Sequence, residues 1–290
     1  MKILTYRRSD LMIIDGKKLA NEIKQDLKKR VEDLKKKGII PKLAIILVGE
    51  DPSSKIYINM KMISGKEVGI ETELHKFPEN FEEKELIELI QELNRDEKVH
   101  AILVQLPLPK HINENRVIEA ISPEKDVDGL TSINMFRLLF KDEFLVPCTP
   151  KGVIKMLDYH KIDLVGKNAV VVGRSKIVGK PIALMLLNRN ATVTVCHSKT
   201  KDLKEHTKNA DVLVVAVGKP KLIIKDMVKE GAVVIDVGIN RVEGKLCGDV
   251  DFENVKDVVS YITPVPGGVG PMTVAMVLEN TLIAAELSKK

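Results

Sequence analysis

Apolar runs alternate with amphipathic runs along the whole chain. In residues 15–38, apolar side chains recur at helical spacing, with Asp15 placed to cap the start of a helix and Gly38 to end it. The first half then continues as an alternation of strands and helices. We expect strands at residues 43–49, 70–77 and 100–106, and helices at 53–68 and 81–96.

The second half repeats this alternation with tighter spacing. Helices fit the gaps between the first three strands, a short helix fits between Gly218 and Gly231, and a long helix closes the chain from Met272. Continuous apolar strands separated by helices are typical of parallel sheets covered on both faces. The fold class is therefore α/β, with a domain boundary near Thr149. The strands are expected at residues 169–173, 192–197, 211–218, 232–238 and 257–262.

The composition is that of an ordinary globular chain with room for two domains. Of the 290 residues, 44% are hydrophobic and 30% charged. No apolar run approaches the ~18 residues of a membrane span. The first eleven residues lack the apolar core of a secretory signal, and we interpret them as a short extension or an upstream start.

Charge and cysteine content exclude several classes of partner. The net charge of +5 comes from dispersed lysines, and only 3% of residues are aromatic, which argues against binding nucleic acid. Cys148, Cys196 and Cys247 are odd in number and far apart. They fit neither a zinc site nor a disulfide framework, so we expect no metal and a reducing, cytoplasmic location.

The run "VVVGRSKIVGKP" (170–181) is a candidate dinucleotide-binding turn. A β-branched strand leads into Gly173, and Gly179 is placed to begin a helix whose free N–H groups attract phosphate. The spacing is G-x₅-G, and Ser175 stands where the usual G-x-G-x-x-G motif has its middle glycine. On spacing alone, a purely structural turn is as good an interpretation.

The end of the next strand bears on the choice of cofactor. NAD-binding units commonly place an acidic residue there to hold the ribose hydroxyls, but this strand ends in "CHSKT". Arg174, Ser198 and Lys199 can instead meet a 2′-phosphate through charge and hydrogen bonds. If the site is real, the sequence favours NADP over NAD.

Seven stretches together resemble one family, the bifunctional methylenetetrahydrofolate dehydrogenase/cyclohydrolases. The resemblance runs from about Ile13 to the C-terminus, and in that family the longer glycine turn is the normal NADP turn. The stretches are "GEDPSSKIYINMK", "QLPLPKH", "SPEKDVDGL", "PCTPKGV", "GRSKIVGKP", "GDVDF" and "TPVPGGVGPMT".

The resemblance implies an architecture and two reactions. It implies an N-terminal αβα catalytic domain (12–149), a Rossmann domain (150–270) and a closing helix (271–290) that packs back on the first domain, with the folate in a cleft between the domains. It also implies NADP-dependent oxidation of 5,10-methylenetetrahydrofolate to the 5,10-methenyl cation. Hydrolysis of that cation then gives 10-formyltetrahydrofolate for one-carbon metabolism and purine biosynthesis. Members are usually homodimers.

Tyr57 and Lys61 lie four residues apart on the predicted helix 53–68, so they share one face. By spacing alone they are better explained as a solvated helix face. The resemblance makes Lys61 the central catalytic residue and Tyr57 the aromatic that stacks on the folate. A lysine can shuttle a proton or activate water if its pKa is lowered toward the working pH.

The resemblance assigns further residues to the folate and to the cofactor. Gln105, at the end of a strand, holds the lysine, and Asp128 grips the pterin with two hydrogen bonds. Nearby Asp126 is an alternative candidate for that role, or a cap or turn residue. Folate-cleft positions are Pro264, Gly267, Gly268 and Gly270; cofactor positions are Gly173, Arg174, Ser175, Ser198 and Ile239.

One departure from the family and two other functions stay open at this point. Many members carry a second lysine two positions after Lys61, where this chain has Ile63, which puts polyglutamate affinity and the ratio of the two activities in doubt. A different two-domain NADP oxidoreductase, such as a shikimate-dehydrogenase-like protein, shares the Rossmann half. A nucleotide-sensing module without chemistry tolerates loss of Lys61, Gln105 or Asp128, but all three are present.

Overall fold

The chain divides into two compact units, and a computed structural model describes residues 11–288. The three-stranded unit comprises Ala20–Cys148 and residues 273–288, and the six-stranded unit comprises residues 11–19 together with Thr149–Met272. Residues 1–10 of the expected N-terminal extension lie outside the described range. None of the helices within residues 11–288 is long and apolar enough to cross a membrane.

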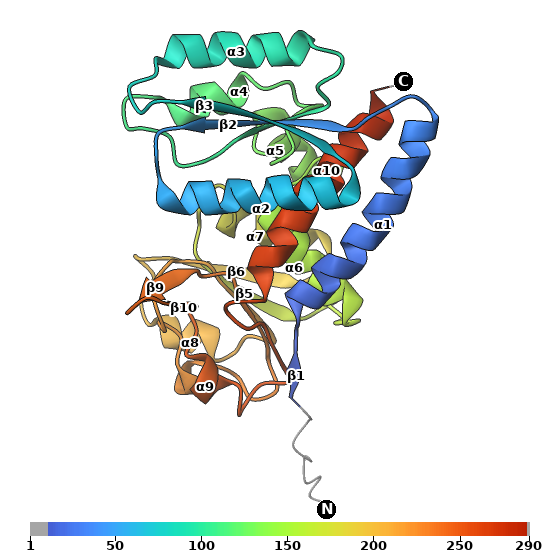
Figure 1. Cartoon of the computed structure of the whole chain (residues 1–290). Coiled ribbons are helices and arrows are strands. Elements are labelled where there is room, and N and C mark those ends of the chain that lie inside the picture. Colours follow the sequence, from blue (N-terminus) through green and yellow to red (C-terminus); the bar gives the residue numbers. More distant parts are fainter. Residues whose placement is uncertain (1–10, 289–290) are drawn as a thin grey trace, which may run out of the picture. The chain divides into compact units, whose positions relative to one another are not determined.

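A parallel sheet forms the centre of the three-stranded unit. Strand β2 (Lys42–Val48) lies between β3 (Glu71–Phe77) and β4 (Ala101–Val104). Every residue of β2 after Lys42 is buried, which explains why its sequence is continuously apolar. Figure 1 shows α3 (Glu83–Arg95) on one face of this sheet and α2 (Pro52–Val68) on the other.

The helices of this unit start and end where local chemistry dictates. The Asp51 carboxylate accepts the N–H of Ser54 at 2.7 Å and so caps α2, while Gly69, at φ +85°, ends it. Asp15 accepts the N–H of Lys18 at 2.9 Å at the start of α1 (Gly16–Lys36), as the sequence predicted. Two shorter helices, α4 (Glu114–Glu119) and α5 (Ser132–Leu139), follow β4.

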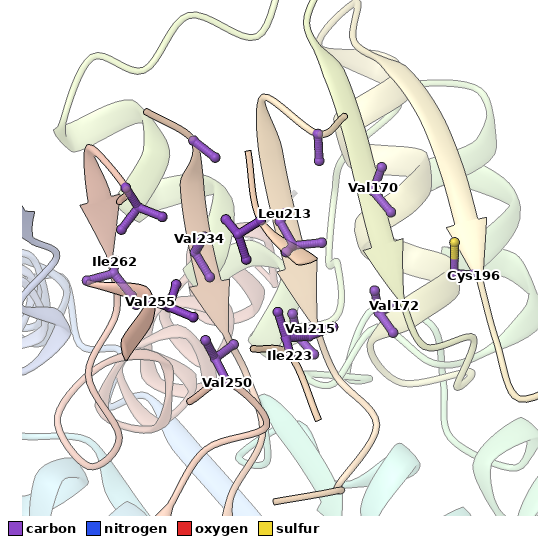
Figure 2. Close-up of a cluster of buried hydrophobic side chains, with 14 residues drawn as sticks. Val170, Val172, Cys196, Leu213, Val215, Ile223, Val234, Val250, Val255 and Ile262 are labelled. Atoms are coloured by element: carbon purple, nitrogen blue, oxygen red, sulfur yellow. The ribbon is translucent and has the colours of Figure 1, made fainter. Parts of the chain in front are cut away.

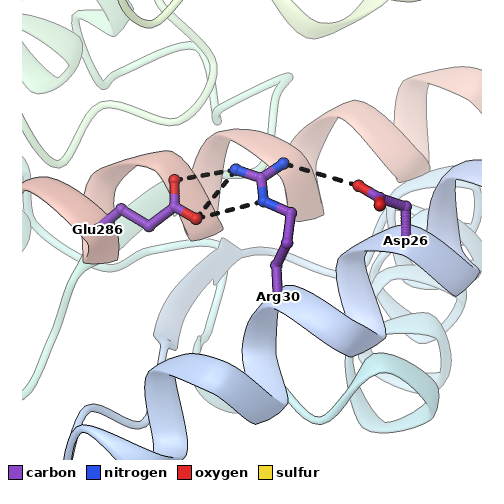
Figure 3. A network of polar contacts seen from close by, with 3 residues as sticks. All are labelled: Asp26, Arg30 and Glu286. Carbon is purple, nitrogen blue, oxygen red and sulfur yellow. Dashed lines mark hydrogen bonds and ion pairs between the residues drawn. The ribbon is translucent and has the colours of Figure 1, made fainter.

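The closing helix α10 (Val269–Leu287) is tied to segments from the first half of the chain. The fully buried Asn280 donates to the carbonyl oxygens of Val127 at 2.7 Å and Val146 at 3.0 Å. Near the end of α10, the Glu286 carboxylate accepts hydrogen bonds from Nε and Nη2 of Arg30 at 2.9–3.2 Å. Nη1 of Arg30 lies 4.0 Å from Oδ2 of Asp26 (Figure 3). The core of the three-stranded unit therefore includes the end of the chain.

A second parallel sheet forms the centre of the six-stranded unit. Its order is β1-β11-β8-β7-β5-β6, and every pairing in it is parallel. A separate antiparallel hairpin follows β8. The strands are β1 (Met12–Ile13), β5 (Asn168–Val172), β6 (Thr192–Cys196), β7 (Val212–Val215), β8 (Val233–Asp236), β9 (Asn240–Val242), β10 (Lys245–Cys247) and β11 (Tyr261–Ile262).

Valine and isoleucine side chains fill one face of this sheet. Figure 2 shows Val172, Val215 and Val234 from three adjacent strands beside Ile223 and Val250 from the loops that follow. Since β-branched residues pack well on a pleated surface, this face needs only short helical segments to cover it. The helical elements of the unit are α6 (Cys148–Tyr159), α7 (Gly179–Asn188), α8 (Leu203–Thr207), the 3₁₀ turn η1 (Lys225–Met227) and α9 (Phe252–Val255).

Several predicted boundaries differ from the observed ones. The strands expected to end at residues 106, 218 and 238 stop at Val104, Val215 and Asp236, because the residues that follow leave the sheet as loops. Strand β1 and the β9–β10 hairpin were not predicted. Helix α6 contains Thr149 and Pro150, and a proline in the first turn of a helix sacrifices no hydrogen bond.

Replacing Asn280 by leucine should destabilise the protein. The carbonyl oxygens of Val127 and Val146 would lose a buried donor, which costs about 2–4 kcal/mol for the pair. The urea midpoint of Asn280→Leu should fall clearly below that of the wild type. Thr281→Val is the matched control, because the Thr281 hydroxyl donates to the carbonyl of Val277 within its own helix. Equal midpoints for the two variants would contradict the role given to Asn280.

Candidate active site

The amine of Lys61 is the centre of the polar cluster in the three-stranded unit. Lys61 lies on the buried face of α2 and is 6% exposed. Its Nζ donates to Oε1 of Gln105 at 2.9 Å. Gln105 follows β4, and its own N–H continues the strand ladder by donating to Ile46 at 2.9 Å. Its amide nitrogen is also engaged, because Nε2 donates to the carbonyl of Leu106 at 2.8 Å. Gln105 is thus held with its oxygen toward the lysine.

The electrostatic surroundings of Lys61 favour a neutral amine more than water does. Burial lowers the pKa of Lys61, and the negative charge of Asp128 opposes this shift. A lysine whose pKa is lowered gives up its proton more readily than an exposed lysine does, which suits it better to acid–base chemistry. From the sequence, a lowered pKa of Lys61 was stated only as a requirement of the catalytic role.

The structure separates the two aspartates that the sequence left open. Asp126 is buried, and its Oδ2 accepts the N–H of Thr131 at 2.8 Å and the amide of Asn134 at 3.0 Å. Burial raises the pKa of Asp126. It therefore acts as a turn residue. Asp128, two positions later, is half-buried and lies close enough to Lys61 to influence its pKa.

Two further residues of α2 bear on this cluster. Tyr57 lies one turn before Lys61 on the same helix face and is half-buried, and burial raises the pKa of its phenol. Ile63, in the place of the second lysine of the family pattern, is 52% exposed. A hydrophobic side chain therefore stands on the helix surface at this position.

Sequence reasoning did not single out Cys148 and Asn280 as part of this cluster. The Cys148 thiol donates to the carbonyl of Val127 at 3.1 Å, and Asn280 donates to the same carbonyl. Together they hold the backbone next to Asp128. The signal was present, because Cys148 lies in the motif "PCTPKGV", but the thiol was considered only for metal and disulfide chemistry.

The glycine turn of the six-stranded unit follows β5. Gly173 has φ +126°, and a Cβ there would overlap the carbonyl oxygen of Ala216, so only glycine fits. Gly179 begins α7 as predicted and lies against the backbone of Gly173. Arg174 and Ser175 are exposed at the tip of the turn.

One expectation about this turn is wrong. The N–H groups at the start of α7 are not free to bind phosphate, because the Ser175 hydroxyl accepts those of Val178 and Gly179, each at 3.2 Å. The carbonyl of Ser175 accepts the next one, from Lys180, at 3.0 Å. The longer loop lets its own serine cap the helix. What the turn offers a ligand is its glycine surface, the exposed Arg174 and the helix dipole.

The remaining predicted cofactor and cleft residues follow the carboxyl ends of strands of the six-stranded sheet. Ser198 is exposed in the loop after β6, where the ring of His197 accepts the N–H of Lys199 at 3.1 Å. Ile239, after β8, is 45% exposed. A Cβ built on Gly270 would lie 3.7 Å from the Cδ1 of Ile239, so this isoleucine meets the glycine-rich loop.

That glycine-rich segment, residues 264–270, comprises a loop and the start of α10, and is shaped by close backbone contacts. Gly267 has φ +104°, and its carbonyl accepts the N–H of Lys17 at 2.9 Å. A side chain on Gly268 would overlap the carbonyl of Pro264. Thus Pro264, Gly267, Gly268 and Gly270 lie in the six-stranded unit together with Ile239, whereas Tyr57, Lys61, Gln105 and Asp128 lie in the three-stranded unit.

Family models match both halves of the chain. Residues 14–128 match the tetrahydrofolate dehydrogenase/cyclohydrolase catalytic domain, and residues 147–289 match the NAD(P)-binding domain of the same family. This chain belongs to the tetrahydrofolate dehydrogenase/cyclohydrolase family. Its α/β organisation, with a catalytic domain and an NAD(P)-binding Rossmann domain, is confirmed.

Individual relatives agree with the family models. The bifunctional protein FolD of Thermodesulfovibrio yellowstonii is 58% identical over 279 residues, which cover 96% of this chain and 98% of that protein. The crystal structure of the bifunctional FolD enzyme of Campylobacter jejuni is 52% identical, with a TM-score of 0.94 over 95% of this chain and 99% of that one. The Trypanosoma brucei enzyme, complexed with NADP and an inhibitor, is 38% identical, with a TM-score of 0.93 over 97% and 99%.

The predicted class of enzyme is therefore confirmed. The chain is a bifunctional dehydrogenase/cyclohydrolase of this family, since its similarity to the bifunctional relatives extends over nearly the whole length of both chains. A shikimate-dehydrogenase-like oxidoreductase and a sensor without chemistry, the two alternatives from the sequence, are set aside.

Removing the acceptor of Lys61 should lower its pKa further. In Gln105→Leu the ammonium form loses the oxygen that Nζ contacts at 2.9 Å, while burial is kept. An NMR titration of the Lys61 side-chain signals would measure this, with Lys36 as an internal reference because Asp33 raises the pKa of Lys36. An unchanged or higher pKa of Lys61 in the variant would show that Gln105 does not stabilise the charged amine.

Proposed function

We propose that this chain oxidises 5,10-methylenetetrahydrofolate with NADP⁺ and hydrolyses the resulting 5,10-methenyl cation, with Lys61 as the group that handles protons. The observation that carries the proposal is the buried amine of Lys61, held by Gln105 and lowered in pKa by burial. The names of the relatives support it, since they are described as bifunctional and one is described with NADP bound.

The side chains of the three-stranded unit would bind and orient the folate. The Asp128 carboxylate can accept two N–H groups from the guanidine-like edge of the pterin. Tyr57, one turn before Lys61, offers its half-buried ring for stacking on the folate. Gln105 keeps the amine of Lys61 in one place while the substrate is bound.

In the hydrolytic step, the oxygen of water bonds to the methenyl carbon. The neutral Nζ of Lys61 takes a proton from that water, and the proton is then returned as the bond from the carbon to N5 breaks and N5 becomes N–H. The formyl group stays on N10, and the overall reaction releases one proton. A lysine with a lowered pKa suits both the acceptance and the return of the proton.

The six-stranded unit would hold the dinucleotide, which supplies the hydride acceptor. Its residues fit such a ligand, because Gly173 leaves the turn without a side chain and Ile239 presents an exposed apolar surface at a strand end. We assign Arg174, Ser175, Ser198 and Lys199 to the adenosine end. Because residues 197–201 directly after β6 carry cations and no acid, NADP⁺ is preferred over NAD⁺ in this proposal.

We further propose a cytoplasmic homodimer. Strand β6 has a single neighbour, β5, in the sheet formed by the described residues, and its Val195 is 39% exposed. An unpaired strand edge with exposed apolar side chains supports self-association. The mass of the protein in solution, measured by light scattering, would test it: a monomer at micromolar concentration would remove this part of the proposal.

Lys61→Met should abolish cyclohydrolase activity without affecting the cofactor. Loss of a positioned proton carrier lowers the rate by roughly 10²–10⁴-fold. Methenyl-group hydrolysis and NADP⁺-dependent oxidation would be measured spectrophotometrically, and NADP⁺ binding by calorimetry. Lys66→Met is the matched control, an exposed lysine on the same helix. Hydrolysis at the wild-type rate in Lys61→Met would remove Lys61 from the mechanism.

Arg174→Ala should weaken NADP⁺ selectively. A hydrogen-bonded charge pair with the 2′-phosphate is worth about 1.5–3 kcal/mol, so KM for NADP⁺ should rise by roughly tenfold or more while KM for NAD⁺ changes little. Lys180→Ala, an exposed cation in the first turn of α7, controls for general charge. An equal rise for both cofactors would refute the assignment of Arg174 to the 2′-phosphate.

A further inference from the structure

The motif "GDVDF" has no part in the function described so far, yet its first aspartate is the most heavily hydrogen-bonded side chain of the six-stranded unit among those described. Asp249 is completely buried. Its Oδ2 accepts the N–H groups of Val217 at 2.7 Å and Gly218 at 2.9 Å. Its Oδ1 accepts the N–H of Lys219 at 2.8 Å and the side-chain amide of Asn240 at 2.9 Å.

A second buried carboxylate lies directly beside it. Asp236 ends β8, and its Oδ1 accepts the N–H groups of Gly238 at 3.0 Å and Asp249 at 2.9 Å. Its Oδ2 accepts the N–H of Val250 at 2.9 Å. Burial raises the pKa of Asp236 to about 6. The two carboxylates together satisfy six backbone N–H groups from loops that follow different strands.

The two aspartates interlock through glycines. Gly238 lies against the carboxylate of Asp249, and Gly248 lies against the carboxylate of Asp236. A Cβ at either glycine would overlap the facing carboxylate, so neither position accepts a side chain without moving it. This explains the pairing of "DVG" (236–238) with "GD" (248–249), which the sequence displays without a reason.

The segments that the carboxylates fix adjoin the proposed cofactor residues. Residues 217–219, bound to Asp249, directly follow Ala216, whose N–H donates to Val172 at 2.8 Å and whose carbonyl lies against Gly173. Ile239 stands between Gly238, held by Asp236, and Asn240, held by Asp249. Both the glycine turn and the apolar wall therefore depend on the same pair of carboxylates.

We propose that Asp249 and Asp236 are positioning residues for the dinucleotide: they set the backbone around Gly173 and Ile239 without touching the ligand. This inference rests on the proposed function, because it takes these two residues as cofactor contacts. It predicts that disturbing the pair impairs the dehydrogenase reaction, which uses the dinucleotide, and spares the cyclohydrolase reaction, which does not.

Asp249→Asn tests this directly. The amide keeps the size of the side chain, but its NH₂ group cannot accept the backbone N–H groups that now face a carboxylate oxygen. Displacements of about 1 Å near a reacting group cost roughly 10²-fold, so we expect KM for NADP⁺ to rise tenfold to a hundredfold. The cyclohydrolase kcat/KM should stay within about twofold. The substitution leaves unchanged the residues of the three-stranded unit that bind the folate in the proposed function.

Asp251→Asn is the matched control. It removes a carboxylate two residues on in the same motif, where the partners are the side chains of Asn254 at 2.5 Å and Lys221 at 3.7 Å. This variant should leave both activities near wild type. If Asp249→Asn lowers both activities equally, Asp249 has only a general structural role and the inference is overturned. An unchanged KM for NADP⁺ would overturn it as well.

A milder variant decides the question if Asp249→Asn does not fold. Asn240→Ala removes one of the four bonds to Asp249 and keeps the carboxylate, so KM for NADP⁺ should rise several-fold with cyclohydrolase activity retained. An unchanged KM in this variant would overturn the inference. Wild-type protein that binds no dinucleotide by calorimetry, with either NADP⁺ or NAD⁺, would instead refute the proposed function, so the two failures are distinguishable.

Discussion

Burial of the Lys61 amine is the constraint around which the three-stranded unit is organised. Taking an ammonium group out of water costs several kcal/mol, so the fold must either supply partners or let the amine lose its proton. It does both in part: Gln105 offers one oxygen, Asp128 contributes a negative charge at longer range, and burial lowers the pKa. The result is a buried amine whose pKa lies below that of an exposed lysine.

The six-stranded unit handles buried charge in the opposite way. Asp236 and Asp249 are as deeply buried as Lys61, but backbone N–H groups surround them on both oxygens. Groups with many fixed donors become rigid, whereas a group with one acceptor keeps its freedom to exchange a proton. The same physical problem, an ionisable side chain without water, is thus met with one hydrogen-bond acceptor in one unit and with many backbone donors in the other.

The alternation of apolar and amphipathic segments was enough to predict both parallel sheets, because the central strands are buried on each face and leave a clear signal. Short elements escaped, since the three residues of β9 or β10 carry no period. The role of Ser175 also escaped, because a serine in a glycine turn is as readily a ligand residue as a cap.

For the site, sequence identified Lys61 and Gln105 through resemblance, and only coordinates could show their contact across 44 residues of chain. The choice between Asp126 and Asp128 depends on burial, which no local pattern reveals. Asp249 lies in the motif "GDVDF", but the backbone amides it binds lie 30–32 residues earlier in the chain. Long-range partners of this kind follow from the order of the strands and cannot be inferred from neighbouring residues.

The two units exchange their chain ends. Strand β1, near the beginning, completes the edge of the six-stranded sheet, and α10, at the end, contributes Asn280 and Glu286 to the three-stranded unit. On the ribosome, residues 20–148 emerge well before α10, which their core requires. A gene cut at residue 149 would separate β1 from its sheet and α10 from the three-stranded unit, and would therefore encode two incomplete halves.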